Sequence, residues 1–538
     1  MEMQGKMTRR TFIAGSAVTA AAAGLALTGC GSSNSSSSAS ASASASSSAS
    51  ATTGGTITAA NAYKSTNCNP IGNSSALMLA ATWHVFEGLY DLDLHTYKTY
   101  QALAGADPTK VSDTEYEVTL RDSAKFSDGT DVKASDVVNA FEKNMANSTY
   151  GAFLSFIDTV TAKSDTTVTF KLKYAFAESL IPARLSVVKI FPASLSEDDL
   201  KTKPIGSGPW AYDEINGEDG GKITFKKNEN YTGKYTAAAD TMEWSPLLDD
   251  TARTTALQEG TVQVMENVPD ANAEQLTGAG ATVEYVQGFS QAFLMFNTLK
   301  APFNDYRVRQ AFFYAIDVEK LIANQLAGQA TAVTSYLTED HSNYHKASTV
   351  YTYDQEKAKS LLSEAGVSGL SFKLLTNNNW VKNLAPQIKN DLEAVGITCE
   401  IDEKSIVWSE LAEPADGVVL DYDVMLTPGD PTCFGNDPDL LLSWWYGDND
   451  WTRGRSCWKK AGDGKFDELQ TLMQTAREAS GDAQQSAWND CFDLIAEQVP
   501  LYALFHRKLA TGYQADKIAG FEPIATTGLV FLGASVKA

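Results

Sequence analysis

Helix patterns and strand patterns alternate along residues 354–401 with short joints, and this alternation limits the possible folds more than any other feature. In residues 354–366, apolar side chains recur at the spacing of one helix face, and the stretch ends at a glycine. Residues 370–374 alternate apolar and polar side chains as a half-buried strand does, and residues 384–401 repeat the helix and the strand. Such an order is typical of an α/β layer. The sequence therefore predicts an α/β lobe over about residues 289–508.

The start of the chain carries an export signal and a tether. A basic region with Arg9 and Arg10 precedes a short uncharged segment, as in a secretory signal peptide, which we place at residues 1–29. The arginine pair resembles a twin-arginine signal, but many ordinary signals also carry two arginines, so the export route stays open. Residues 30–53 are almost entirely serine, alanine and glycine after Cys30. Such a segment has no apolar face to bury and forms a flexible tether.

The segment Leu27-Thr28-Gly29-Cys30 resembles the lipobox of bacterial lipoproteins. In a lipobox the cysteine thiol is acylated and becomes the new N-terminus, so the resemblance implies lipidation at Cys30. Several acyl chains anchor a protein stably to a bilayer. We therefore expect an exported protein that is lipid-anchored to the outer face of the cell membrane or lies in the periplasm. No later apolar run is long enough to cross a bilayer.

The chain is acidic, with 43 Lys and Arg against 66 Asp and Glu and a formal net charge of −23. This balance argues against nucleic acid as a partner and against docking on anionic lipid. The cysteines after Cys30 are dispersed without a CxxC pair, so no zinc framework is visible. Disulfides can form outside the cytoplasm, and Cys433 with Cys457 is the pair we expect first. We expect a monomer without a cofactor or a metal.

A series of short motifs runs through the chain between about residues 55 and 520. The motifs are LRDSAKFSDG at 120–129, ASDV at 134–137, PIGSGPW at 204–210, NT at 297–298, PFNDYRVRQA at 302–311, YAID at 314–317, YDQEKAKSLLSEAG at 353–366 and LEAVGI at 392–397. In this order they resemble the signature segments of the peptide/nickel-type (family 5, cluster C) solute-binding proteins of ABC importers. Several motifs in the family's order identify the family far more specifically than any single motif does.

The resemblance implies a bilobal, periplasmic-binding-protein-like (class II) α/β fold with an extra domain inserted in lobe I. Lobe I would comprise residues 54–92, 203–288 and 509–538, the inserted domain residues 93–202, and lobe II residues 289–508. In this family the ligand is held between the lobes, which close around it by a hinge motion.

Two of the motifs have a structural interpretation. Residues 126–129, FSDG, predict a turn in which Gly129 takes a positive φ. Residues 205–209, IGSGP, predict a crossing between the lobes, where glycine tolerates unusual dihedral angles.

The resemblance implies the substrate-binding subunit of an ABC importer, which captures an oligopeptide or similar small organic solute and delivers it to a membrane permease. A nickel or haem receptor of the same family is an alternative, and a surface receptor or adhesin without a transport role is another. An enzyme is not expected, since no nucleophile elbow, P-loop, Rossmann fingerprint or HExxH helix occurs. His341 and His345 have the spacing of a metal-binding helix face, but they stand in a polar, loop-like stretch.

Aromatic residues gather among turn residues between positions 421 and 458, where Phe434, Trp444, Trp445 and Trp451 stand near Asp430. Rings placed among glycines and prolines indicate loops that line a cavity. A packed aromatic core beneath long loops explains the same composition, and Trp444 and Trp445 on a predicted helix fit that alternative better. Both interpretations stay open from the sequence. We include Asp430, Phe434 and Trp444 among the candidate ligand-binding residues.

One position departs from the pattern of the peptide-binding members. In those proteins an aspartate three residues before an acidic-Pro dipeptide pairs with the α-ammonium group of the ligand. Here the dipeptide is Asp430-Pro431, and Thr427 stands in the place of that aspartate. This departure argues against recognition of a free peptide N-terminus by this position. Asp430 itself could substitute for the aspartate if the loop shifts, or the ligand lacks the amine.

Three further aromatic residues are candidate liners of the ligand site. Tyr63 follows the first predicted strand, and Trp380 follows a polar run at the end of another. Ligands of α/β sheets meet the carboxyl ends of the strands. Trp408 stands where members of the family place an aromatic residue near the cleft.

Overall fold

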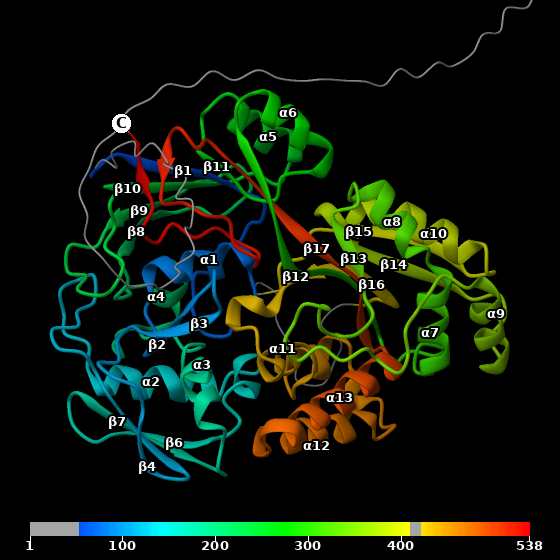
Figure 1. Ribbon diagram of the computed structural model, residues 1–538, viewed down its shortest axis with the longest axis horizontal. Helices are drawn as coiled ribbons and strands as arrows, with labels where there is room; N and C mark the ends of the chain where they lie inside the picture. Colours follow the sequence, from blue (N-terminus) through cyan, green and yellow to red (C-terminus); the bar gives the residue numbers. More distant parts are fainter. Residues whose placement is uncertain (1–52, 409–420, 538) are drawn as a thin grey trace, which may run out of the picture. The chain divides into compact units, whose positions relative to one another are not determined.

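The computed structural model describes residues 53–408 and 421–537 (Figure 1). The predicted signal peptide, the predicted lipidation site Cys30 and all but the last residue of the predicted tether lie outside these residues. No helix in the two described ranges combines the length and the apolar content that a membrane crossing needs.

One large mixed sheet contains strands from both predicted lobes, so the α/β class is confirmed. In spatial order its strands are β15 (Thr398–Lys404), β14 (Ser371–Asn377), β16 (Val424–Gly429), β12 (Thr282–Phe296), β17 (Leu501–Tyr513), β11 (Val264–Met265), β1 (Thr56–Asn61), β10 (Thr241–Pro246), β9 (Ile223–Lys227) and β8 (Trp210–Ile215), with β13 (Ala330–Ala332) paired to β17.

The long strands β12 and β17 connect the two halves of this sheet, as Figure 1 shows. They pair antiparallel along almost their whole length, but the register shifts between Gln287, which faces Lys508, and Gln291, which faces His506. A bulge of this kind bends a strand and increases its local twist. The predicted lobe boundaries at 288/289 and 508/509 fall at this irregularity.

The expected alternation of helices and strands over residues 354–401 is confirmed by α9 (Gln355–Glu364), β14, α10 (Ala385–Glu393) and β15. Asp354 caps α9, because its carboxylate accepts a hydrogen bond of 2.9 Å from the Lys357 N–H. Gly366 follows the helix with a φ of +70°, a conformation that favours glycine. Strands β14 and β15 pair in parallel, as strands joined through a helix do. The other helices of lobe II are α7 (Tyr306–Ala315), α8 (Val318–Gln325), α11 (Pro438–Tyr446), α12 (Lys465–Glu478) and α13 (Gly481–Gln498).

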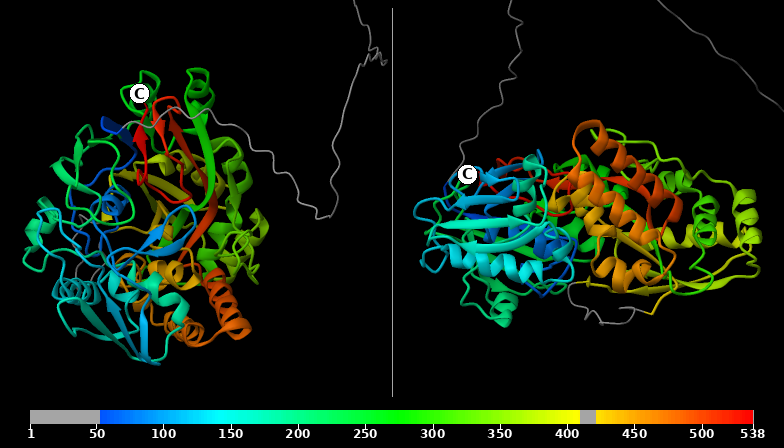
Figure 2. Two further views of the ribbon diagram at one scale, coloured as in Figure 1. Left: turned by 60° about the vertical axis from the view of Figure 1, so that its left-hand side comes forward. Right: turned by 90° about the horizontal axis from the view of Figure 1, so that it is seen from below.

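The region predicted to be an inserted domain has its own sheet, with β4, β5, β7 and β6 in that order, and Figure 2 shows α2 along one face of it. The hairpin β2–β3 crosses the predicted boundary at 92/93, because Asp93 pairs with Lys98. The elements between residues 90 and 202 are β2 (Tyr90–Asp93), β3 (Lys98–Gln101), β4 (Thr109–Ser112), β5 (Glu115–Thr119), α2 (Ala134–Met145), β6 (Ile157–Ala162), β7 (Thr167–Leu172), α3 (Ile181–Leu185) and α4 (Glu197–Thr202). The remaining α-helices and strands of the described residues are α1 (Ala76–Val85), α5 (Asp250–Gln258), α6 (Ala273–Gly278), β18 (Ile518–Ala519) and β19 (Ser535–Val536).

The structure confirms the prediction for the glycine in residues 126–129 but not the one for the glycines in residues 205–209. Gly129 has a φ of +88°, so the predicted turn is confirmed. Gly206 and Gly208 are not among the residues with a positive φ, so the explanation by unusual dihedral angles is wrong. A Cβ atom at Gly206 would lie 2.0 Å from the Val85 carbonyl oxygen, and one at Gly208 would lie 2.4 Å from the carbonyl oxygen of His84. Glycine is needed there because the chain passes directly against the end of α1.

The predicted disulfide is also wrong, since Cys433 and Cys457 are not joined. Cys433 belongs to the short 3-10 helix η6 (Pro431–Phe434), where its Sγ lies 3.8 Å from the Asp430 carbonyl oxygen. Cys457 is fully buried, and its Sγ lies 3.9 Å from the carbonyl oxygen of Arg455. The two thiols lie in different surroundings that the sequence spacing does not reveal.

Candidate ligand-binding site

A cavity of about 150 Å³ lies among loops of both lobes, and we call it the central cavity. Residues of lobe I, of lobe II and of the C-terminal segment contribute to its wall. Of the candidate ligand-binding residues, those that line it are Tyr63, Trp408, Thr427, Asp430, Phe434 and Trp444.

The sheet explains why residues far apart in sequence meet at this cavity. Strand β14 pairs in parallel with both β15 and β16, so the carboxyl ends of the three strands lie at one edge. Asn378 follows β14, Trp408 stands four positions beyond the end of β15, and Thr427 stands near the end of β16. All three line the cavity, which therefore lies at the carboxyl ends of strands, as ligand sites of α/β sheets do.

Trp380 is not among the residues that line the central cavity, contrary to the prediction. It opens the 3-10 helix η4 (Trp380–Leu384), which Asn379 caps through a hydrogen bond from the Val381 N–H. This turn directs the indole ring onto strand β17, where the guanidinium carbon of Arg507 lies 4.3 Å from the ring centroid. The tryptophan thus supports the wall behind Tyr63 instead of facing the cavity.

The carboxylate of Asp430 ties lobe II to the C-terminal segment. Its Oδ1 accepts hydrogen bonds from the Thr432 N–H at 3.1 Å and the Thr432 hydroxyl at 2.5 Å. Its Oδ2 accepts from the Thr527 N–H at 2.8 Å and the Thr527 hydroxyl at 3.2 Å. Burial raises the pKa of this carboxyl group, and the four hydrogen bonds act in the opposite direction. Because a carboxylate offers about four acceptor sites, Asp430 has none left for a ligand ammonium group in this arrangement.

Tyr63 lines the central cavity and lies close to the buried carboxyl group of Glu266. Burial, followed by the nearby Glu266, raises the pKa of the Tyr63 phenol to about 12. Burial also raises the pKa of Glu266 to about 7, although the Ala62 N–H donates a hydrogen bond of 2.9 Å to its carboxylate. The phenol therefore stays a hydrogen-bond donor at neutral pH.

Both interpretations of the aromatic cluster hold for Trp444. It lines the central cavity, yet only 4% of it is exposed. Its ring lies 4.8 Å from Phe434 and is stacked at 6.0 Å on Phe153 of the inserted domain, measured between centroids. Trp445 is buried in a similar way, with its centroid 4.4 Å from that of Trp451. The rings are at once a core between two parts of the molecule and one wall of the cavity.

Trp451 was part of the aromatic-rich stretch but not one of the candidate ligand-binding residues, and Arg455, which packs against it, was not considered. Trp451 lines the cavity and begins a π-helical turn (Trp451–Arg455), a form often found at functional sites. The guanidinium carbon of Arg455 lies 4.5 Å from the ring centroid of Trp408 and 4.2 Å from that of Trp451. The aromatic-rich stretch that contains Trp451 had indicated loops that line a cavity. No pattern in the sequence indicates that Arg455 packs against two neighbouring indoles.

A buried network of ion pairs joins the inserted domain to lobe II near this cavity. Arg184 of α3 places Nη2 at 2.7 Å from Asp437 Oδ1 and at 2.8 Å from Asp439 Oδ2. Arg477 contacts the other oxygen of Asp439 at 2.7 Å. Burial raises the pKa of the Asp439 carboxyl group, but the two guanidinium groups outweigh it and hold that pKa below its usual value. Nearby, Asp450 accepts hydrogen bonds from Ser148 and Thr149, which extends the same contact.

The two histidines noted in the sequence contact different parts of lobe II, and His345 Nε2 lies 3.5 Å from Asp493 Oδ1. His341 Nε2 lies 2.6 Å from the Asn436 carbonyl oxygen, and its Nδ1 accepts a hydrogen bond from the Asn343 N–H. Within the described part of the chain, no group of three or more His, Cys, Asp or Glu side chains could hold a metal ion.

The model of the bacterial extracellular solute-binding proteins, family 5 (middle), matches residues 98–462. The chain belongs to this family. The match covers the inserted domain from β3 onward, the strands β8–β12 and most of lobe II, so it includes the loops of lobe II that line the central cavity. The family resemblance of the sequence motifs is thereby confirmed.

Relatives of this solute-binding protein carry names that refer to different ligands. The glutathione-binding protein GsiB of Escherichia coli (strain K12) is 28% identical over 348 residues, which make up 62% of this chain and 67% of GsiB. The heme-binding protein A of Haemophilus influenzae is 26% identical over 417 residues, 70% of this chain and 74% of that protein. A dipeptide binding protein from Pseudoalteromonas sp. SM9913, solved in complex with Met-Leu, has a TM-score of 0.77 at 20% identity and covers 90% of this chain and 100% of its own. This likeness confirms the predicted bilobal fold.

Proposed function

We propose that this solute-binding protein is the substrate-binding subunit of an ABC importer, which captures an oligopeptide or similar small organic solute and delivers it to a permease. The observation that carries the proposal is the lining of the central cavity. Rings of Trp408, Trp444 and Trp451 stand there with the polar side chains of Thr427 and Asn378, contributed by separate strands and loops. Apolar walls with a few polar groups are typical of sites for small organic ligands.

The central cavity fits an uncharged or internally neutral part of a solute. Its charged lining residues among the described positions are Lys64 and Asp430. Lys64 forms an ion pair of 2.8 Å with Glu218, and the carboxylate of Asp430 is fully engaged in hydrogen bonds. No histidine of the described ranges lines this cavity, which favours an organic solute over haem or a nickel complex that needs a nitrogen ligand.

A ligand screen on the full chain tests the function. The panel contains di- to hexapeptides, sugars, haem and nickel–histidine chelates, and unfolding is followed by calorimetry. A true ligand at 100 times its Kd is expected to stabilise the protein by about 2.7 kcal/mol, since it binds only the folded state. Stabilisation by haem or by the nickel chelate alone would favour the receptor alternative. If no class stabilises the chain at saturating concentration, the proposal is wrong.

We also propose that the protein is exported and held at the outer face of the membrane by lipid on Cys30. Support comes from the basic start, the uncharged segment and the Leu27-Thr28-Gly29-Cys30 motif. The variant Cys30→Ser is expected to move from the membrane fraction to the soluble fraction and to lose acyl chains in the mass spectrum. A Ser36→Ala variant in the tether serves as control and should stay in the membrane fraction. Acylation that persists in Cys30→Ser would contradict this assignment.

A further inference from the structure

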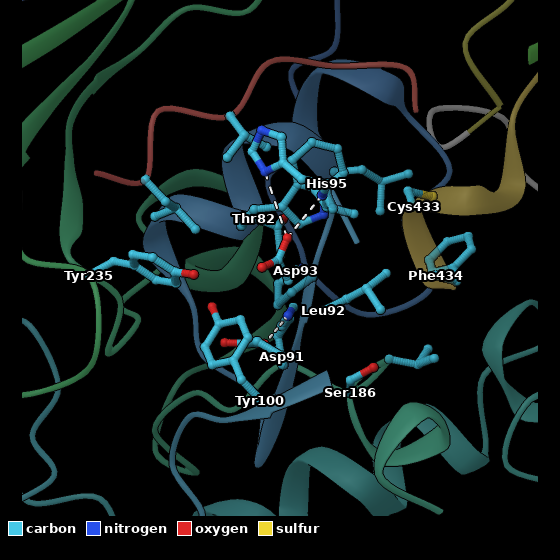
Figure 3. A pocket seen from close by; sticks show the side chains of 18 of the residues that line it. Thr82, Asp91, Leu92, Asp93, His95, Tyr100, Ser186, Tyr235, Cys433 and Phe434 are labelled. Carbon is cyan, nitrogen blue, oxygen red and sulfur yellow. Dashed lines mark hydrogen bonds and ion pairs between the residues drawn. The ribbon is translucent and has the colours of Figure 1, made fainter. Parts of the chain in front are cut away.

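A second cavity of about 260 Å³ adjoins the central cavity, and we call it the lateral cavity (Figure 3). The two share the lining side chains Leu79, Cys433 and Phe434. The rest of its wall comes from Pro70, α1, the β2–β3 hairpin, Tyr150, residues 186–189, Tyr235 and the C-terminal segment. The shared side chains stand at the boundary of the two cavities, so the lateral cavity borders the proposed ligand site.

The lateral cavity is acidic, unlike the central one. Its lining includes the carboxylates of Asp91, Asp93 and Glu522 but the ammonium group of Lys189 alone. Lys189 forms an ion pair with Asp91, and its Nζ lies 2.5 Å from Asp91 Oδ1. Asp93 Oδ1 accepts hydrogen bonds from backbone N–H groups of its own turn and lies 3.7 Å from His95 Nδ1. Glu522 forms no ion pair with another described residue, so negative charge is left over in this cavity.

Aromatic rings surround these carboxylates. Figure 3 shows Tyr100 and Tyr235 on one side of Asp91 and Asp93, and Phe434 on the other. The rings of Tyr100 and Tyr235 meet edge to face at 5.5 Å. The ammonium group of the exposed Lys234 already lies 4.5 Å from the first ring centroid and 4.7 Å from the second. Ring faces next to carboxylates attract organic cations through their quadrupole as well as through the charges.

The division of charge between the two cavities points to an extended ligand. A cationic group in the central cavity would find a single carboxylate, that of Asp430, whose acceptor sites are occupied. The same group in the lateral cavity would meet Asp93 and Glu522 beside tyrosine rings.

We propose that the ligand extends from the central cavity along Phe434 into the lateral cavity and carries an ammonium or guanidinium group there. This proposal rests on the proposed function and adds the substrate class, which is an elongated solute with a basic group away from the part held in the central cavity. The basic group interacts with Asp93 and Glu522, and the apolar part of its side chain lies against Tyr100 and Tyr235.

The test is calorimetric titration of the full chain with three peptides whose N-termini are acetylated, Ala-Ala, Ala-Ala-Ala-Ala and Ala-Ala-Ala-Lys, so that the lysine side chain is the only ammonium group. The lysine peptide is expected to bind about tenfold more tightly than the alanine tetrapeptide, the size of effect that a hydrogen bond to a charged group gives. In the double variant Asp93→Asn, Glu522→Gln that preference should vanish, while the affinity for Ala-Ala stays unchanged. Asparagine keeps an oxygen for the turn hydrogen bonds of Asp93 and removes only the charge.

Asp516→Asn is the matched control, because Asp516 is an exposed acid of the same C-terminal segment and lines neither cavity. It should retain the preference for lysine. Equal affinities for the two tetrapeptides in the wild-type protein, or a preference that survives the double substitution, would overturn the role of the lateral cavity while leaving the proposed function intact. Failure of all three peptides to bind would contradict the capture of peptides itself and this proposal with it.

Discussion

Replacing Arg184 with methionine is expected to lower the free energy of unfolding by about 3–5 kcal/mol, the usual cost of removing one partner from a buried ion pair. The guanidinium group is 1% exposed and contacts Asp437 and Asp439. Methionine fills a similar volume, so the loss comes mainly from carboxylates that remain buried without their partner. Asp439, whose side chain is 4% exposed, would keep the ion pair with Arg477 and the hydrogen bond from the Ser443 hydroxyl. Urea unfolding followed by tryptophan fluorescence measures the change, because Trp444 lies near this contact.

Arg307→Met is the matched control for this substitution. Arg307 also pairs with an aspartate, Asp305, at 2.6 Å, but its side chain is 37% exposed. Exposed ion pairs contribute about 0.2–1 kcal/mol, so the control should change little. If both variants lose the same small amount, the network between the inserted domain and lobe II does not stabilise the fold as we infer.

Replacing Trp408 with alanine is expected to weaken ligand binding by about 30-fold or more, the loss that truncation of a buried aromatic anchor produces. Trp408 lines the central cavity and is 9% exposed. Its ring lies 5.3 Å from Trp451 and faces the guanidinium group of Arg455. Alanine removes a wall of the cavity and the aromatic face on Arg455. Titration with the ligand found in the screen measures the effect.

Two further variants show whether this loss reflects the ring itself. Trp408→Phe keeps an aromatic face over Arg455 and should lose less affinity than the alanine variant. Tyr306→Ala removes a ring that is 38% exposed on the surface and does not line the cavity, so its affinity should equal that of the wild-type protein. Unchanged affinity in Trp408→Ala would move the ligand site away from the central cavity.

Much of the local structure was predictable because it depends on neighbours along the chain. The Asp354 cap, the apolar face of α9 and the stop at Gly366 are all encoded within one short stretch. The sequence motifs indicated the family, and the family implied the bilobal fold. The resemblance to the family also indicated Trp408 and Thr427 as residues near the ligand, and both line the central cavity at the carboxyl ends of the parallel strands β15 and β16. Tyr63 follows β1, which runs in the opposite direction, and lines the same cavity.

Other features depend on which segments pack together, and no local pattern carries that information. The position of Trp380 depends on its stacking with Arg507 from another strand. The prediction of a disulfide between Cys433 and Cys457 was wrong for the same reason, because the two side chains lie in different surroundings. The glycines at 206 and 208 were recognised, but their cause, the close approach to α1, was visible only in three dimensions.

The sequence by itself predicted the export signal and indicated the helices and strands of residues 354–401, the family and the unusual threonine at position 427. The tertiary structure decided what that threonine means for binding. It brought Thr527, 97 positions from Asp430, close enough to occupy the carboxylate that could have replaced the missing aspartate. It also brought Arg184 to Asp439, 255 positions away, and set the acidic lateral cavity beside the central one. Hydrogen bonds and ion pairs act over a few ångströms in space, so contacts between distant segments become visible only when the chain is folded.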